Sequence, residues 1–521
     1  MFIFCTWSTL TRLRRGAALG LCAALALASV TPALGAATAE PAPTHLPSLG
    51  DGLALSLAAE RRIGDRVARE IYQHPDYLDD PVLDEYLQSI WQPLLGAARA
   101  RGDVSPELLE QLAWELMISR DRRVNAFALP GGYLGLNLGL IAVTDSADEL
   151  ASVLAHELVH VSQRHIARLL QRQERMAPWV LGSLILGALA ASANADLANA
   201  AITGTQAVAA QTQLNFSRDM EREADRVGFA VLIDAGFDGQ GFVSMFDKLQ
   251  QANRLNDDGS FPYLRSHPLT IERRADMQAR LPAPLSGAAT PPPAQTSRSP
   301  ELHALMAARA RVLAESRAPR LLAWAQYGQT AGARAADLYA GAAAAQRLGQ
   351  GALALTLAQR LRQQVAPAAH WAADALLLEV LLATPGASAT ANPLLAELRD
   401  QALRASGRGQ VLLGAQAAIA TGVPQRAAAR LQDWVLRHPR DAQAWETLAQ
   451  AQQAQGQSLR ALRSQAESHV ARLDYAGALE RLQAAQQGPE AQQGADPIDL
   501  AIIDSRRRAV QSLLNESLRE N

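Results

Sequence analysis

The sequence predicts a mainly α-helical protein, with a small β-sheet in its first half and a helical solenoid in its second half. The 521-residue chain is rich in Ala, Arg and Gln, which favours helices, and it is long enough for two or three domains. Residues 124–141 instead have the aromatic and β-branched composition of strands. A Pro-rich linker at residues 282–300 divides the chain, and the sequence after it shows a 34-residue self-similarity.

The N-terminus has the three zones of a secretory signal peptide. Three arginines precede an apolar stretch at residues 17–30, and small residues suited to cleavage follow it. We therefore predict a cleaved signal peptide at residues 1–36, with an uncleaved membrane anchor as the alternative. Both cysteines, Cys5 and Cys22, lie in this segment, so the mature protein would have no disulfide in an oxidising compartment.

The first domain is predicted to cover residues 46–281. Amphipathic patterns indicate helices near residues 53–72 and 81–98. The central Pro-Gly-Gly of residues 124–141 indicates two short strands around a turn. Residues 146–173 then have the pattern of one long helix.

The pentapeptide HELVH, at residues 156–160, has the arrangement of a catalytic zinc site. His156 and His160 are four residues apart, so both imidazoles project from one face of a helix and can bind one ion. Glu157 lies about 100° around the helix from His156, beside the ion and not on it. We expect zinc to lower the pKa of a water molecule. Glu157 would take the proton of this water and pass it to the leaving amine of a cleaved peptide.

A catalytic zinc site needs a third protein ligand, and the sequence offers two candidates. If the helix continues, His165 lies about 180° around from His156, which favours a structural or supporting role over a ligand. Glu221 and Asp225 lie one turn apart in a later predicted helix, where Glu223 is a poorer ligand. Glu221 could complete the site, and Asp225 could accept a hydrogen bond from a zinc-bound His. A solvated charged helix face is the alternative for this segment alone.

Residues 177–193 are uncharged and apolar, but marginal in length for crossing a bilayer. We expect a hydrophobic hairpin or lid near the site, or an element that touches a membrane surface, with a true membrane span as the alternative. The formal net charge of −2 argues against nucleic-acid binding, which needs an excess of basic residues on one face.

The second half of the chain is predicted to contain tetratricopeptide-like helical repeats at residues 301–488 and a C-terminal helix at residues 498–521. Small residues recur at the spacing by which such helix pairs pack; Ala415, for example, recurs as Ala449. A generic Ala-rich helical bundle is the alternative, because such matches arise easily in Ala-rich sequences.

The motif HELVHVSQRH, followed after a long insertion by SRDMEREAD, resembles the gluzincin metallopeptidases related to HtpX and the CAAX prenyl proteases. The stretch NAFALPGGYLGLNLGLI resembles the segment before the zinc helix of that family. The resemblance covers residues 50–281, and the signal peptide and repeats are similar to its periplasmic branch. One departure is Val159, where relatives usually have Gly, which changes the packing behind the site.

The resemblance implies that Glu221 is the third zinc ligand and that Asp225 supports a zinc-bound His. It also implies that an extended substrate pairs with the strand near Asn125, Ala126 and Phe127, or with its continuation to Ile141.

His267 lies in a Ser-His-Pro sequence that resembles an element of the periplasmic branch. There the His can approach the zinc and occupy the open position, so His267 is a possible gating ligand that switches the enzyme off. A loop His that never touches the metal is the alternative.

The expected function is that of an exported zinc-dependent endopeptidase with one Zn²⁺ per subunit. By resemblance, its substrates are unfolded or misassembled outer-membrane β-barrel proteins, and its partner is the β-barrel assembly machinery. The repeats would recruit or restrain these proteins in the periplasm. A chaperone or scaffold that acts through its repeats, with a latent protease site, is the alternative.

Overall fold

A computed structural model describes residues 55–172, 217–255, 261–281, 299–384, 392–488 and 496–519. Three predicted features lie outside these residues: the signal peptide, the uncharged run at residues 177–193 and nearly all of the linker at residues 282–300. Within the described ranges, no helix is both long enough and apolar enough to cross a membrane.

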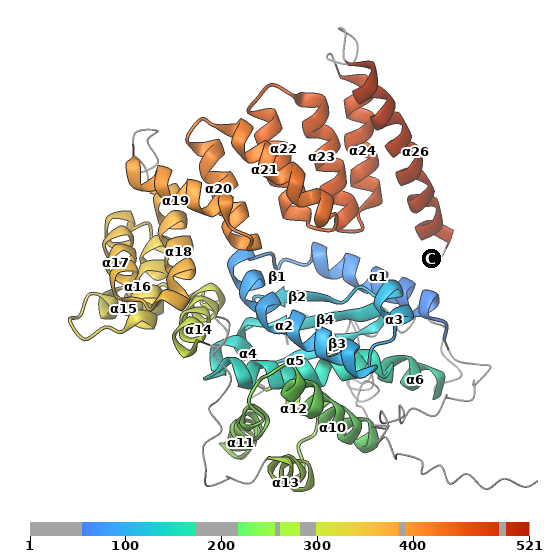
Figure 1. The fold of residues 1–521 in the computed structure, drawn as a ribbon, viewed down its shortest axis with the longest axis vertical. Helices are drawn as coiled ribbons and strands as arrows, with labels where there is room; N and C mark the ends of the chain where they lie inside the picture. The colour runs from blue at the N-terminus through green and yellow to red at the C-terminus, as the bar shows by residue number, and fades with distance from the viewer. Residues whose placement is uncertain are drawn as a thin grey trace, which may run out of the picture. The chain divides into compact units, whose positions relative to one another are not determined.

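The described residues confirm the predicted fold class, because helices predominate and one small sheet lies among them in the first half of the chain (Figure 1). The elements of this half are α1 (Leu57–Gln73), β1 (Tyr77–Leu78), α2 (Pro81–Arg101), α3 (Pro106–Gln111), β2 (Glu115–Ser119), β3 (Ala126–Leu129), η1 (Pro130–Gly132), β4 (Tyr133–Asn137), α4 (Leu138–Val143), α5 (Ala147–Ser162), α6 (His165–Arg172), α10 (Arg218–Asp234), α11 (Gln240–Leu255), α12 (Tyr263–Ser266) and α13 (Ile271–Arg280).

The sheet has four strands in the order β1-β2-β4-β3, so β3 forms one of its edges. β2 is parallel to β4, whereas β1 and β3 run antiparallel to their neighbours. The two strands predicted around Pro-Gly-Gly are β3 and β4. Gly131 and Gly132 between them have φ values of 74° and 86°, which only glycine adopts without strain. β3 lies against α5, the helix that carries HELVH.

The second of these strands is shorter than predicted. β4 ends at Asn137, and residues 138–143 form α4 instead of extending the strand to Ile141. The partner strand β2 ends at Ser119, opposite Asn137, so no further ladder hydrogen bonds are available there. A helix satisfies its own backbone groups and still buries the apolar side chains of this segment.

The predicted long helix is broken in two, and the prediction of one continuous element was wrong. α5 ends at Ser162 and α6 begins at His165, since Arg164 has a φ of 52°, in the left-handed region that few residues with a side chain adopt. The Arg164 guanidinium donates to Glu60 Oε2 at 2.9 Å and to the Leu55 carbonyl. Contacts with a distant part of the sequence therefore hold this break, and local periodicity does not reveal them.

The described part of the second half consists of helices. They are α14 (Pro300–Ala314), α15 (Ala318–Gly328), α16 (Ala335–Arg347), α17 (Gly351–Gln364), η3 (Pro367–Ala369), α18 (His370–Ala383), α19 (Pro393–Arg404), α20 (Arg408–Ala420), α21 (Pro424–Arg437), α22 (Ala442–Gln453), α23 (Ser458–Ala471), α24 (Tyr475–Gln487) and α26 (Pro497–Arg519).

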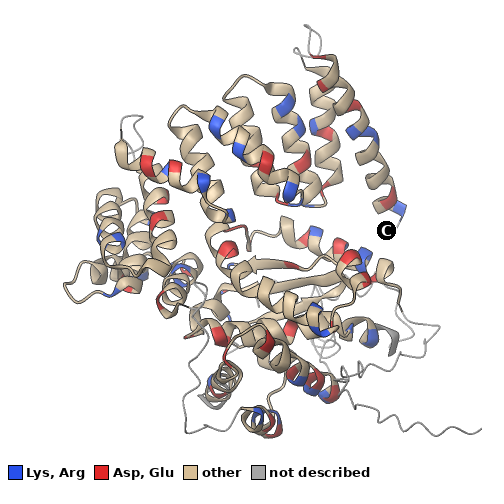
Figure 2. Ribbon diagram, viewed as in Figure 1, with Lys and Arg blue, Asp and Glu red and all other residues tan. Residues whose placement is uncertain are grey.

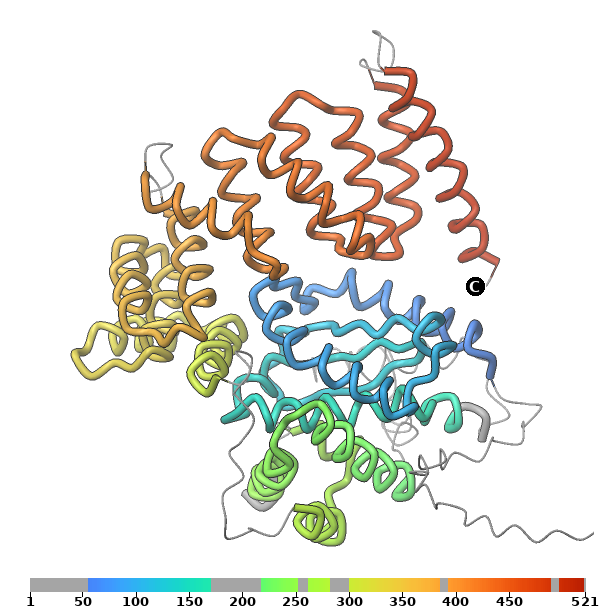
Figure 3. Tube along the Cα trace, in the orientation of Figure 1, coloured from blue at the N-terminus to red at the C-terminus, as the bar shows by residue number. Residues whose placement is uncertain are grey.

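From α20 onward, neighbouring helices pack on one another in sequence order (Figure 3). α20 begins at residue 408 and α22 at residue 442, and this spacing of 34 residues separates the starts of α21 and α23 as well. The turns repeat too, because Gly422 and Gly456 both have positive φ values, of 75° and 72°. The helical solenoid is confirmed, and the tetratricopeptide assignment stays a prediction.

Two predicted boundaries shift slightly. Ser299 caps α14, which begins at Pro300, so the last two residues of the predicted linker belong to the helix that follows. α26 begins at Pro497, one residue before the predicted C-terminal helix. Proline is favourable at the first position of a helix, where its missing N–H is not needed.

Two buried side chains of α14 contact the first half of the chain. His303 Nδ1 lies 2.6 Å from the Tyr86 hydroxyl, and His303 Nε2 lies 2.8 Å from the Thr144 carbonyl oxygen. Arg309 donates to both carboxylate oxygens of Asp80, the residue that caps α2. Figure 2 shows basic and acidic residues interspersed along the solenoid helices after residue 392, in keeping with the small net charge of −2.

Candidate metal centre

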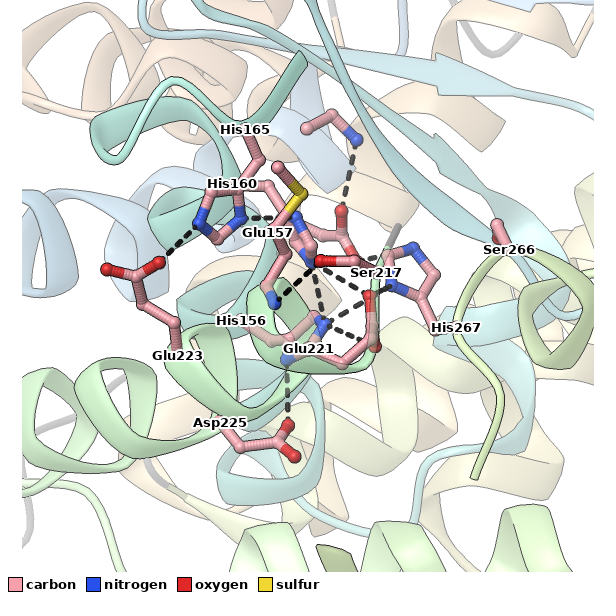
Figure 4. A network of polar contacts seen from close by, with 12 residues as sticks. His156, Glu157, His160, His165, Ser217, Glu221, Glu223, Asp225, Ser266 and His267 are labelled. Atoms are coloured by element: carbon pink, nitrogen blue, oxygen red, sulfur yellow. Dashed lines mark hydrogen bonds and ion pairs between the residues drawn. The ribbon is translucent and has the colours of Figure 1, made fainter. Parts of the chain in front are cut away.

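The centre is built on α5, a helix whose residues are nearly all buried. His156 and His160 lie in it with 1% and 0% of their surface exposed, and their Nε2 atoms are 3.0 Å apart (Figure 4). Burying a polar ring is costly unless its nitrogens have partners. Two ring nitrogens that face each other at this distance need a proton or a cation between them.

α10 brings Glu221 to this histidine pair. Its carboxylate oxygens lie 3.5 Å from His160 Nε2 and 3.5 Å from His156 Nε2. Gly228 makes this close approach possible, because a Cβ there would lie 3.2 Å from the His156 backbone nitrogen. The structure thus places the three predicted ligands together, on two helices in direct contact.

His267 joins the same cluster from the end of α12. Its Nδ1 lies 3.2 Å from His156 Nε2 and 3.1 Å from Glu221 Oε1. Its backbone N–H donates to the Tyr263 carbonyl, and its ring stacks on the Tyr263 ring with centroids 4.6 Å apart. One ligand atom from each of His156, His160, Glu221 and His267 lies within 4.8 Å of the others.

Glu157 lies beside the cluster and is fully buried. Its Oε2 accepts a hydrogen bond from the Ala128 N–H of β3 at 3.0 Å. Its Oε1 lies 3.5 Å from His267 Nε2 and accepts no hydrogen bond from the described residues. The carboxylate therefore presents one anchored oxygen and one available oxygen next to the cluster, which suits a group that takes up a proton.

Asp225 and Arg273 support the cluster from behind. Asp225 Oδ1 lies 3.0 Å from His156 Nδ1, as the helical spacing predicted. Arg273 donates to both Asp225 oxygens, at 2.6 and 2.8 Å, and its Nη1 lies 2.8 Å from Glu221 Oε2. Sequence reasoning missed Arg273. The available signal was its position four residues before Met277, since these two residues form the buried face of α13.

His165 does not lie on the far side of the helix from the cluster. Because α5 ends before it, its Nδ1 lies 2.9 Å from His160 Nδ1, while its Nε2 lies 3.1 Å from Glu223 Oε2. The same Glu223 oxygen accepts from Arg168 Nη1 at 3.1 Å. Glu223 thus lies outside the four-residue cluster, and His165 links it to His160.

Burial and neighbouring charges shift the pKa values of the cluster residues. Burial alone would lower the pKa of His156, but hydrogen bonds to Asp225 and Glu221 raise it to about 9. Burial would raise the pKa of Glu221, but His267 and His156 hold it well below its usual value. Burial lowers the pKa of His160 well below that of a free imidazole, and His156 lowers it further. The cluster therefore combines an anionic carboxylate with nitrogens that compete for one positive charge.

These residues fit a zinc ion. Two imidazoles and a carboxylate are a common ligand set for catalytic zinc, and each ligand has a supporting partner: Asp225 for His156, His165 for His160 and Arg273 for Glu221. The available oxygen of Glu157 lies next to the cluster without belonging to it.

β3 brings the predicted substrate-pairing residues to the same place. The Asn125 carbonyl accepts from the Asn137 N–H, so Asn125 and, by alternation, Phe127 direct their backbone groups toward β4. Ala126 and Ala128 then face the other way, toward the sheet edge, where Ala128 meets Glu157. Ala126 is the predicted pairing residue whose backbone faces that edge.

Comparisons with known proteins match the part of the chain that contains the cluster. Residues 83–281 match Peptidase family M48. A Vibrio cholerae relative is 37% identical over 246 residues, 47% of this chain and 49% of the relative. The Beta-barrel assembly-enhancing protease of Escherichia coli K12 is 34% identical over 275 residues, 52% of this chain and 53% of its own length. The mitochondrial metalloendopeptidase OMA1 of Arabidopsis thaliana is 29% identical over 187 residues, 36% of this chain and 35% of the relative.

The first two matches span about half the length of each relative. The family match contains every residue of the cluster and the side chains that support it, from His156 on α5 to Arg273 on α13. Residues 83–281 therefore resemble a Peptidase family M48 domain.

Proposed function

We propose that this chain is a zinc-dependent endopeptidase, exported to the periplasm, that acts in outer-membrane protein quality control. The observation that carries this proposal is the buried cluster of imidazoles and a carboxylate within reach of one ion, with the Glu157 carboxylate beside it. The Peptidase family M48 match and the endopeptidase names of relatives support it.

His156, His160 and Glu221 would hold one Zn²⁺ in each subunit. Asp225 Oδ1 lies 3.0 Å from His156 Nδ1, so it would hold a proton on Nδ1 and leave the Nε2 lone pair directed at the ion. Arg273 restrains the Glu221 carboxylate and the Asp225 carboxylate together. When bound, zinc supplies a Lewis acid that polarises a peptide carbonyl and lowers the pKa of water.

Glu157 would carry the proton. The hydrogen bond from the Ala128 N–H holds Oε2 in place, and this restricts the positions that Oε1 can take. Oε1 takes a proton from the attacking water, and the same carboxyl group then delivers it to the leaving amine. The two transfers need no rearrangement of α5 because both use one oxygen.

The outer edge of β3 would hold the substrate. A peptide that pairs with the Ala126 backbone extends the sheet by one strand and runs past the residue that anchors Glu157. Such pairing recognises backbone and not sequence, which suits a protease of unfolded proteins. Asn125 and Phe127 would hold this strand in register through β4.

A cleavage assay tests this function. Purified full-length chain is expected to degrade unfolded casein, to lose this activity after chelation by 1,10-phenanthroline, and to regain it when Zn²⁺ is restored. A serine-protease inhibitor serves as the control and should change nothing. Cleavage that survives complete metal removal would contradict the proposal.

We further propose that His267 gates the enzyme. Its Nδ1 lies with the ligand atoms, and its Nε2 lies 3.5 Å from Glu157 Oε1, so the ring separates Glu157 from the place of the ion. A substrate carbonyl and a water molecule would need this same space. The Tyr263 stack and the backbone hydrogen bond to Tyr263 hold the ring there.

His267→Ala is expected to raise the rate of casein cleavage several-fold, with the zinc content unchanged, because it frees the space beside Glu157. Steady-state cleavage and metal content are measured on the same preparation. An unchanged or lower rate with full zinc occupancy counts against gating.

For substrates and partners, we propose unfolded or misassembled outer-membrane β-barrel proteins and the β-barrel assembly machinery. The names of the bacterial relatives, which concern β-barrel assembly, support this assignment. The solenoid of α14 to α26 would recruit or restrain these proteins, and the chain would contact a membrane surface only peripherally.

A further inference from the structure

The segment that joins α5 and α6 directs the His165 side chain toward His160. On a continuous helix, five residues separate two side chains by about 140°, so His165 and His160 would diverge. In the structure their Nδ1 atoms are 2.9 Å apart. The left-handed backbone of Arg164, with φ of 52°, produces the change of direction. Non-glycine residues in this region are costly and persist where surrounding contacts impose them.

The Arg164 side chain makes contacts that hold its backbone in this conformation. Arg164 Nε donates to Glu60 Oε2 at 2.9 Å, and Glu60 is itself only 2% exposed. α1 therefore restrains the backbone where α5 ends, through the buried Glu60 carboxylate and the partly exposed Arg164 guanidinium. The left-handed backbone of Arg164 and its ion pair with Glu60 together determine the position of His165.

The protons along this path have only one consistent arrangement. If the His160 Nε2 lone pair binds the ion, the His160 proton lies on Nδ1 and is donated to His165 Nδ1. His165 must then carry its own proton on Nε2, where it donates to Glu223 Oε2 at 3.1 Å. Glu223 accepts a second hydrogen bond from Arg168 at 3.1 Å, which fixes its carboxylate.

We propose that His165 is a positioning residue for the metal ligand His160, and that Glu223 and Arg168 hold His165 in the required tautomer. This inference rests on the proposed zinc site. His156 is supported by a carboxylate directly, whereas His160 is supported by a neutral imidazole that relays to a carboxylate. The two ligands are therefore oriented by different groups. The role of His165 can be tested by a substitution that leaves both ligand residues unchanged.

The test measures Zn²⁺ affinity by competition with a chromophoric chelator at one neutral pH. His165→Phe keeps a ring but removes the acceptor, and it is expected to weaken zinc binding about 10–100-fold, the usual effect of losing a ligand's supporting partner. The visible absorption of the Co²⁺-substituted protein should also change, since the His160 ring loses its fixed orientation.

Two comparisons make the result specific. His303→Phe removes an equally buried imidazole outside the cluster and should leave zinc affinity unchanged. Glu223→Gln retains an oxygen acceptor for His165 and should bind zinc more tightly than Glu223→Ala. If circular dichroism shows that His165→Phe does not fold, the comparison of Glu223→Gln with Glu223→Ala tests the positioning role instead.

Wild-type affinity and an unchanged cobalt spectrum in His165→Phe would overturn the positioning role, as would equal losses in His165→Phe and His303→Phe. Equal affinities of Glu223→Gln and Glu223→Ala would also overturn it. A His160→Ala variant separates this from the proposed function: if it still binds zinc as wild type does, the zinc site itself is wrong.

Discussion

Glu157→Gln is expected to lower casein cleavage by about 10²–10⁴-fold while the protein keeps its zinc, because an amide cannot take up the proton. The substitution preserves the shape of the side chain and an oxygen that can accept from the Ala128 N–H, which now meets Glu157 at 3.0 Å. The loss should therefore appear in kcat, with metal content unchanged. Single-turnover cleavage with measured zinc content is the direct assay.

Glu149→Gln is a matched control for this variant, since it makes the same change on the same helix. Glu149 pairs with Lys248 and accepts from the Asp145 N–H, and it does not belong to the metal cluster. Its cleavage rate should stay close to wild type. Near-wild-type cleavage by a contaminant-free Glu157→Gln preparation would remove Glu157 from the chemistry.

Arg309→Met is expected to reduce the free energy of unfolding by about 3–5 kcal/mol, the usual cost of leaving buried charges without their partner. Arg309 lies on α14 and is buried between Asp80 of the α2 cap and Glu379 of α18, with contacts of 2.8 and 2.7 Å. It also donates to the Tyr339 hydroxyl at 3.0 Å. Removing the guanidinium leaves two carboxylates without this cation.

Urea denaturation followed by circular dichroism measures the change, with Arg460→Ala as the control. Arg460 pairs with Asp499 at 2.9 Å but is largely exposed, and exposed pairs contribute about 0–1 kcal/mol. A loss in Arg309→Met no larger than in Arg460→Ala would show that this buried pair does not hold α14 in place.

Local chemistry explains what the sequence predicted well. HELVH specifies its own geometry, because four-residue spacing on any helix puts two imidazoles on one face. Glu221 and Asp225 repeat that spacing. In the structure Glu221 lies 3.5 Å from both His156 and His160, and Asp225 lies 3.0 Å from His156. The Pro-Gly-Gly turn is equally local, because it depends on the φ values of two glycines.

Distant contacts explain what the sequence did not predict. The break between α5 and α6 depends on Glu60, which lies 104 residues before Arg164 in the sequence. Helical periodicity gives no information about such a partner. It therefore predicts His165 on the face of the helix opposite to the cluster, whereas His165 lies next to His160. The contacts of Arg273 with Asp225 also join distant parts of the chain, since the two residues are 48 positions apart in the sequence.

The most direct test of the whole account is the zinc content of the purified protein, measured by native mass spectrometry together with that of two ligand variants. Wild-type chain is expected to carry one Zn²⁺, and His160→Ala and Glu221→Ala are expected to lose it while remaining folded. Retention of one Zn²⁺ with unchanged affinity by both variants would contradict the assignment of these residues as the metal centre.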